Sequence, residues 1–217
     1  MKKQEIAVIG LGTFGFELAV QLARHGHDVL AIDIDEKKVN AIKDLVPVAV
    51  VADVSDEDVL KKLELDKFDK IIFGMSSELE TIILAITYLK KMNAKYIIGK
   101  ANTRIKKEIL LKLGVDEVIL PEISTAIRLA EKISYPSLKE KLHIDLKHAL
   151  FEVKVPPQFV GKSLKELNLR HKYGINVILR KNQEGTQMIT SPDIRLQQGD
   201  EILVIGEEKN IYKLFNT

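Results

Sequence analysis

The chain has 217 residues, of which 46% are hydrophobic and 29% charged, and its formal net charge at pH 7 is +2. This composition is typical of a soluble globular protein, and the balanced charge gives no reason to expect a nucleic-acid partner. Cysteine is absent, which excludes disulfides and thiolate metal sites and favours a cytoplasmic location. No apolar run approaches the ~18 residues of a membrane span.

Strand and helix signals alternate through the first 120 residues. Expected strands cover 5–10, 27–35, 47–56, 68–75, 94–102 and 115–122. Expected helices cover 14–26, 36–46, 56–65, 78–92 and 104–114, with Ser55 as the predicted cap of the third and Ser76 or Ser77 of the fourth. Short Val/Ile-rich strands that alternate with helices predict an α/β fold, a Rossmann-like doubly wound parallel sheet over residues 1–122.

The pattern changes after residue 122. Residues 123–133 form an amphipathic helical pattern that Pro136 ends, and 137–144 is expected to continue as a crossover, which makes 123–144 a segment of linker helices. The remaining residues, 145–217, predict a small α+β domain. Its expected strands are 148–156, 175–183, 186–190 and 200–207, with a short helix at 163–169.

A glycine-rich turn follows the first strand. Residues 10–15, GLGTFG, fit G-x-G-x-x-G and open a helix, where free N–H groups and the helix dipole favour phosphate. Asp33 ends the second strand, where it is placed to bind ribose hydroxyls. Because Asp35 follows and no arginine does, a 2′-phosphate would meet two carboxylates, which disfavours NADP. NAD(H), ATP and ADP all stay open.

An NAD-dependent oxidoreductase is the alternative function. Tyr135 and Lys139 match Y-x-x-x-K, but Pro136 disfavours helix at the tyrosine. The five histidines show neither metal-binding nor catalytic spacing. The sequence therefore predicts no catalytic residue and no enzyme.

The chain as a whole resembles the RCK (regulator of K⁺ conductance) subunits of Ktr/Trk potassium transport systems. The N-terminal part carries AVIGLGTFG, HDVLAIDIDEKKVN, IIGKANT and GVDEVILPE. The C-terminal part carries FVGKSLKELNLRHKYGINVILRKNQ and SPDIRLQQGDEILVIGEEKNI. The resemblance covers nearly the whole chain, and the pairing of the two parts is more specific than the N-terminal motifs alone.

The resemblance implies a regulatory subunit without catalytic activity. Such subunits form homodimers that assemble into an octameric ring beneath an integral-membrane K⁺-translocating subunit, at the inner face of the plasma membrane. A bound adenine nucleotide shifts the shape of the ring, and the ring gates the membrane subunit. The nucleotide would act as a signal, through its different affinities for two shapes.

The resemblance also implies the ligand contacts. They are Gly10, Gly12, Thr13, Phe14 and Gly15 at the phosphates, Asp33, Ile34 and Asp35 at the ribose, and Ala52, Asp53, Met75, Ser76, Ser77, Lys100, Ala101 and Asn102 around the adenosine. Asp53 has an alternative role as a helix cap for 56–65. Glu122 would hold a divalent cation near the phosphates.

Thr13 departs from the family pattern, because Ktr-type relatives often carry an arginine there. A threonine hydroxyl cannot supply the charge-assisted contact of a guanidinium to a terminal phosphate. The choice between ATP, ADP and NAD(H) therefore stays open, with Lys100 or Lys106 as possible replacements for the missing cation.

Some relatives bind cyclic di-AMP in the C-terminal domain. The matching positions in this chain are Leu169, Arg170, Asn176 and Pro192. An arginine and an amide are suitable partners for a phosphate and a base.

Overall fold

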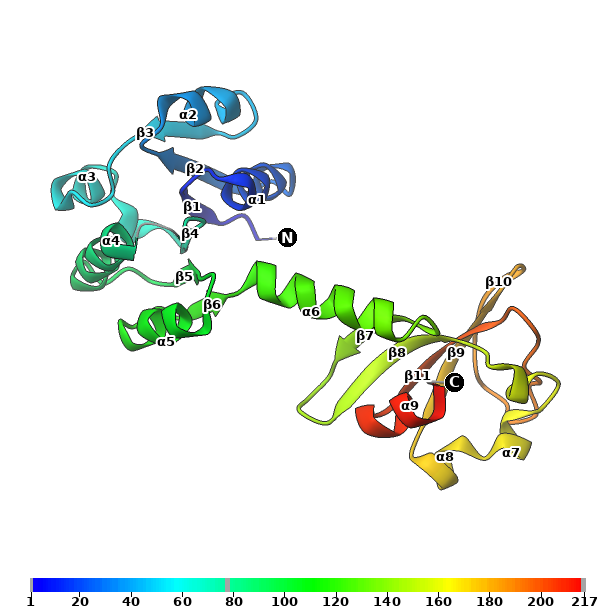
Figure 1. Cartoon of the computed structure of the whole chain (residues 1–217). Coiled ribbons are helices and arrows are strands. Elements are labelled where there is room, and N and C mark those ends of the chain that lie inside the picture. The colour runs from blue at the N-terminus through cyan, green and yellow to red at the C-terminus, as the bar shows by residue number, and fades with distance from the viewer. Residues whose placement is uncertain (1, 77–78, 216–217) are drawn as a thin grey trace. The chain divides into compact units, whose positions relative to one another are not determined.

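A computed structural model describes residues 2–76 and 79–215 of the chain. These residues form two compact units, of which one ends at Thr125 and the other begins at Ala126. Figure 1 shows the elements of both units along the chain.

The first unit is built on a six-stranded, fully parallel sheet with the order β3-β2-β1-β4-β5-β6. The strands are β1 (Glu5–Ile9), β2 (Asp28–Asp33), β3 (Val48–Val51), β4 (Lys70–Phe73), β5 (Ile97–Lys100) and β6 (Glu117–Ile119). This order confirms the predicted doubly wound fold. From β1 the sheet is built outward in one direction through β2 and β3 and in the other through β4, β5 and β6, so the strand order reverses between β1 and β4. Sheets of this kind bind ligands at the carboxyl ends of the strands beside such a reversal.

Helices cover both faces of this sheet (Figure 1). They are α1 (Thr13–Arg24), α2 (Glu36–Ile42), α3 (Glu57–Lys62), α4 (Leu79–Lys91) and α5 (Arg104–Lys112), with a short 3-10 turn at Leu65–Lys67. Alternate residues of β1 divide between two cores: Val8 packs with residues of α1 and α2, and Ile9 packs with residues of α3, α4 and α5. Both side chains are almost fully buried, as expected for a strand covered on both faces.

The cap of α3 differs from the prediction. Asp56, not Ser55, caps this helix, and its carboxylate accepts a hydrogen bond from the Asp58 N–H over 2.8 Å. Ser55 instead donates to Asp53 from both its N–H and its hydroxyl group. Ser77, one of the two caps predicted for α4, lies outside the described residues.

The second unit contains a five-stranded antiparallel sheet with the order β10-β9-β11-β8-β7. Its strands are β7 (Leu138–His143), β8 (His148–Lys154), β9 (Asn176–Asn182), β10 (Gly185–Met188) and β11 (Glu201–Glu207). Its helices are α7 (Leu164–Leu167), α8 (Leu169–Tyr173) and α9 (Glu208–Phe215), with a 3-10 turn at Pro157–Phe159; α6 (Pro121–Ser134) spans the boundary between the units. The core gathers around Phe151, Val204 and Phe215, all nearly inaccessible to solvent.

The crossover predicted for 137–144 is wrong, because this segment is a strand. After α6 ends, β7 runs antiparallel to β8 and forms an edge of the sheet. The reversal depends on Asp145, whose carboxylate accepts hydrogen bonds from the N–H groups of Lys147 (2.7 Å) and His148 (2.8 Å). These backbone hydrogen bonds, with one from the His148 ring, lower the pKa of Asp145 to about 2. The tight turn at Asp145 reverses the chain, so that β8 runs antiparallel beside β7.

The helix α9 was not predicted. It is eight residues long, and its buried residues Ile211 and Phe215 are four positions apart, which places them on one face of the helix. Ile211, Leu214 and Phe215 have the i, i+3, i+4 spacing of an amphipathic helix, so the signal was present in the sequence and was missed. The helix is stabilised by packing of Phe215 against Phe159, with ring centroids 5.7 Å apart.

A largely buried lysine joins α6, β7 and α9. The Lys141 ammonium donates hydrogen bonds to Glu131 of α6 (3.0 Å), to Glu208 and to the Tyr212 hydroxyl (3.2 Å). Burial opposes the positive charge, but these hydrogen bonds outweigh it and raise the pKa of Lys141 above its ordinary value. The ammonium therefore stays charged and holds three elements of the second unit together.

We expect Lys141→Ala to lower the free energy of unfolding of the second unit by about 2–4 kcal/mol, because a partly buried charge network loses its central cation. The matched control is Lys213→Ala on the exposed side of α9, which should change it by less than about 0.5 kcal/mol. Urea unfolding followed by circular dichroism measures both. Equal losses in the two variants would contradict the structural role of Lys141.

Candidate nucleotide-binding site

A pocket of about 270 Å³ opens at the carboxyl ends of β1, β2 and β4, where the sheet reverses its winding. It is lined by Ile9, Gly10, Gly12, Ile32, Asp33, Ile34, Lys38, Ala52, Asp53, Val54, Gly74, Met75, Ser76, Thr81 and Lys100. The residues come from the ends of five neighbouring strands, β3, β2, β1, β4 and β5, and from the first turns of α2 and α4. The location is the one at which doubly wound sheets bind nucleotides.

The glycine turn is determined by two positions that no larger residue can occupy. Gly10 has a φ of +90°, and a Cβ atom there would lie 2.9 Å from the Cβ of Met75. A Cβ atom on Gly15 would lie only 1.9 Å from the Gly10 carbonyl oxygen. The absence of both atoms lets α1 start directly at the end of β1.

Gly12 is different, because the protein itself does not require glycine there. Its φ is −68°, which any residue adopts, and no protein atom lies within 4 Å of the position of an added Cβ. The residue lines the pocket and stands at the N-cap of α1 without any side-chain cap. The space left open in front of a helix N-terminus is suited to a phosphate group, which the free N–H groups and the helix dipole would bind.

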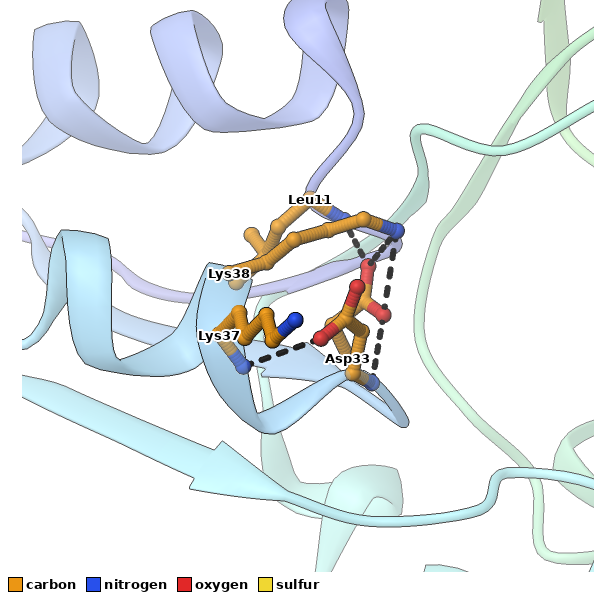
Figure 2. Close-up of polar contacts among 5 residues, drawn as sticks. Leu11, Asp33, Lys37 and Lys38 are labelled. Carbon is orange, nitrogen blue, oxygen red and sulfur yellow. Dashed lines mark hydrogen bonds and ion pairs between the residues drawn. The ribbon is translucent and has the colours of Figure 1, made fainter.

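Asp33 is the buried acid of the pocket (Figure 2). Its Oδ2 accepts a hydrogen bond from the Leu11 N–H over 2.6 Å, and its Oδ1 accepts one from the Asp35 N–H over 2.9 Å. The Lys38 ammonium lies 3.2 Å from Oδ2 and 3.4 Å from Oδ1. The acid of β2 is thus tied to the glycine turn and to the first turn of α2.

The carboxyl group of Asp33 is ionised at neutral pH. Burial alone would raise its pKa, but the hydrogen bonds from Asp35, Leu11 and Lys38 together bring the pKa below the ordinary value. An ionised carboxylate accepts hydrogen bonds only, which suits it to the hydroxyl donors of a ribose. The predicted role of this residue therefore agrees with its protonation state.

Asp53 lines the pocket just after the end of β3. Its alternative role as cap of the following helix is wrong, because Asp56 caps α3. The Asp53 carboxylate instead accepts hydrogen bonds from the N–H (2.9 Å) and the hydroxyl (2.7 Å) of Ser55. These contacts fix the turn after β3 and hold the acid in the pocket wall.

Lys100 supplies a cation to the pocket. Its ammonium lies 2.6 Å from Glu122 Oε1 and 5.6 Å from the ring centre of Phe14, and its side chain is 12% exposed. The hydrogen bond from Lys100 is the first cause of the lowered pKa of Glu122. Lys106, the other proposed replacement for an arginine at position 13, donates instead to the Ser76 carbonyl over 2.8 Å.

The cation predicted at Glu122 stays a prediction. This carboxylate is paired with Lys100, and the described part of the chain contains no group of three His, Cys, Asp or Glu side chains with metal-binding geometry.

The structure brings nine of the predicted contact residues into the pocket wall: Gly10, Gly12, Asp33, Ile34, Ala52, Asp53, Met75, Ser76 and Lys100. The other predicted residues with described positions lie outside the wall: Thr13, Phe14, Gly15, Asp35, Ala101, Asn102, Lys106 and Glu122. Ala101 belongs to the hydrophobic core and is fully buried. Asp35 caps α2 through the Lys37 N–H. Ser77 lies outside the described residues.

Six wall residues were missed: Ile9, Ile32, Lys38, Val54, Gly74 and Thr81. Gly74 had a signal, since it is a glycine directly after β4 and directly before the predicted Met75. Its added Cβ would lie 2.7 Å from the Gly10 carbonyl oxygen. Lys38 carried no signal, because a lysine on an exposed helical turn is an ordinary surface residue until its helix is placed beside Asp33.

A second hollow, of about 420 Å³, lies in the second unit between α7, α8 and the loop after β10. Its wall contains all four residues that were matched to cyclic di-AMP binding, namely Leu169, Arg170, Asn176 and Pro192. Leu169 also belongs to the core, so its side chain supports the wall from within.

The tyrosine of the oxidoreductase alternative has a packing role. Tyr135 follows the last residue of α6, and its ring centre lies 4.5 Å from that of Tyr212. It packs against the core of the second unit. The structure does not describe the side chain of Lys139.

Two family domains match the chain in the order of its two units. A TrkA-N domain matches residues 6–121 and a TrkA-C domain matches residues 149–217. The chain belongs to the TrkA family. The TrkA-N match covers the sheet and the pocket described above, and the TrkA-C match covers β8 to α9.

Relatives of this TrkA-family chain are similar over nearly their whole length. The Ktr system potassium uptake protein C of Bacillus subtilis is 36% identical over 211 residues, which cover 96% of this chain and 95% of that protein. The Ktr system potassium uptake protein A of Vibrio alginolyticus is 32% identical over 210 residues, or 96% and 94% of the two chains. The predicted resemblance to Ktr/Trk subunits is confirmed.

Solved structures share the fold of the TrkA-family chain. The GsuK channel aligns with a TM-score of 0.68 at 15% identity and covers 98% of this chain and 39% of its own. The GsuK channel bound to NAD aligns with a TM-score of 0.67 at 16% identity, with the same coverage. At these identities the likeness establishes the architecture of both units. Among the residues described, no helix is both long and apolar enough to cross a membrane.

Two glycine variants separate the stability of the turn from its ligand binding. We expect Gly15→Ala to destabilise the first unit by about 3 kcal/mol or more, because the new methyl group overlaps the Gly10 carbonyl. We expect Gly12→Ala to change stability by less than about 1 kcal/mol and to weaken ADP binding at least tenfold, since its methyl group enters the phosphate space. Thermal unfolding and isothermal titration measure the two effects. Normal ADP binding by Gly12→Ala would contradict the assignment of the phosphate position.

Proposed function

We propose that this chain is the cytoplasmic, nucleotide-sensing regulatory subunit of a K⁺ uptake system and that it has no catalytic activity of its own. The observation that carries the proposal is Gly12, where the fold leaves an open space at a helix N-terminus that the protein does not use. Its relatives of nearly equal length are Ktr system potassium uptake proteins, which supports a potassium-transport role.

The ligand is an adenine nucleotide, ADP, ATP or NAD(H). Its phosphates lie in front of Gly12 and α1, its ribose meets Asp33, and its adenine fits between Asp53 and Met75. Lys100 provides the positive charge that Thr13 lacks, with Glu122 as its counter-ion. The solved structures of GsuK bound to NAD and to ADP support this class of ligand.

Residues 1–122 form the nucleotide-binding domain and 145–217 form a second ligand-binding domain, which takes cyclic di-AMP in the hollow beside Arg170. Homodimers assemble into an octameric ring at the inner face of the plasma membrane and contact an integral-membrane K⁺-translocating subunit. Nucleotide binding favours one shape of the ring over another, and this difference in affinity drives gating.

A thermal-shift titration tests the ligand assignment. We expect ADP, ATP or NADH to raise the melting temperature at millimolar concentration, because a ligand that binds only the folded state stabilises it by mass action. The Gly12→Ala variant serves as the control and should show a smaller shift at the same nucleotide concentration. Absence of any shift with all three nucleotides would refute nucleotide sensing. Substrate-dependent consumption of NADH by the purified chain would favour the oxidoreductase alternative.

Arg170→Ala tests the second ligand. Arg170 is exposed at the wall of the hollow, so its loss should leave folding intact and weaken cyclic di-AMP binding about tenfold or more by removing a charge-assisted contact to phosphate. Lys172→Ala, on the same short helix but outside the wall, should bind cyclic di-AMP normally. Titration calorimetry with cyclic di-AMP and with ADP separates the two sites. Equal effects of both variants would contradict a specific role of Arg170.

A further inference from the structure

The Asp33 carboxylate has no acceptor site left for a ribose. A carboxylate offers about four lone-pair positions, two on each oxygen. Oδ2 accepts from the Leu11 N–H and from the Lys38 ammonium, and Oδ1 accepts from the Asp35 N–H and from the same ammonium. Every position is thus in use before a ligand binds.

The donors differ in whether they can leave. The Leu11 N–H belongs to the glycine turn and the Asp35 N–H to the turn between β2 and α2, so neither can move without a change of the backbone. The Lys38 side chain is long and 44% exposed, whereas that of Asp33 is 6% exposed. Only the Lys38 end of this ion pair is exposed, so the lysine side chain can rotate into solvent while the carboxylate stays in place. Figure 2 shows the ammonium extending from α2 across the edge of the carboxylate.

We propose that the Lys38 ammonium occupies the ribose-binding edge of Asp33 in the free protein and that the 2′- and 3′-hydroxyls of the nucleotide displace it. Lys38 is then a specificity-determining residue that competes with the ribose for one carboxylate. This inference rests on the proposed binding of an adenine nucleotide and identifies what regulates the affinity of that site.

The competition has two physical consequences. In the free protein the ammonium neutralises a carboxylate that is otherwise buried, so the empty pocket carries no uncompensated charge. In the bound protein two hydroxyl donors replace it, and the nucleotide must supply the free energy that separates the ion pair. Lys38 therefore lowers the affinity for ligands with a ribose diol and moves half-saturation to higher nucleotide concentrations.

The test compares ADP with 2′,3′-dideoxy-ADP, which lacks both hydroxyls. We expect Lys38→Met, which keeps the length of the side chain and removes its charge, to bind ADP about three- to tenfold more tightly than the natural chain does. Its affinity for dideoxy-ADP should stay within about twofold, because no diol competes for Asp33. Titration calorimetry on the full chain gives both dissociation constants, and the ratio between them is the readout.

Three variants make the result specific. Lys37→Met removes a neighbouring exposed lysine whose backbone, not its ammonium, contacts Asp35, and it should leave the ratio unchanged. Lys38→Arg keeps a cation beside Asp33 and should resemble the natural chain. Lys38→Gln provides a second neutral residue, and thermal unfolding without ligand confirms that each variant is folded.

The outcomes separate the inference from the proposed function. An unchanged ratio in both Lys38→Met and Lys38→Gln overturns the competition, and so does a selective loss of ADP affinity, which would make Lys38 a donor to the ribose. In both cases ADP still binds the natural chain and the proposed function stands. If the natural chain binds none of ADP, ATP and NADH, the proposed function fails and the role of Lys38 fails with it.

Discussion

The direct contact between the start of α1 and the ends of β1 and β4 is the constraint on which the nucleotide site depends. A Cβ atom added to Gly15 would lie 1.9 Å from the Gly10 carbonyl oxygen, and a Cβ atom added to Gly74 would lie 2.7 Å from the same oxygen. Three glycines therefore meet around one oxygen atom. Their contact aims the N-terminus of α1 across the carboxyl edge of the sheet, and any separation of these elements would move the free N–H groups away from the pocket.

Asp33 adds a negative charge to the pocket beside the glycine turn. The Leu11 N–H binds the acid directly, so the position of the glycine turn and that of the acid depend on each other. The hydrogen bonds keep the carboxylate ionised although it is buried, and they also limit the acceptor sites that it offers to a ligand. The groups that build the site therefore also determine how strongly it can bind, and Lys38 is the one among these donors that can leave.

The second unit combines its hydrophobic core with a charged contact. Its sheet is antiparallel and its helices are short, and the Lys141 ammonium links α6, β7 and α9 through Glu131 and Tyr212. Because α6 spans the boundary between the units, this ammonium ties the connecting helix to the sheet that follows it. Comparison with Ktr proteins shows that both units occur together over nearly the full length of relatives, as the paired motifs of the sequence predicted.

The sequence by itself determined the parallel sheet, the glycine turn and the position of Asp33 beside that turn, because each depends on short-range rules: strand composition, the spacing of the glycines and the position of an acid at a strand end. Only the tertiary structure decided β7 and the part played by Lys38. The 137–144 segment is a strand because the turn at Asp145 places it against β8. Lys38 lies beside Asp33 because α2 packs on the sheet. Both features depend on a neighbouring strand or on the placement of a whole helix, and local patterns in a single sequence do not contain that information.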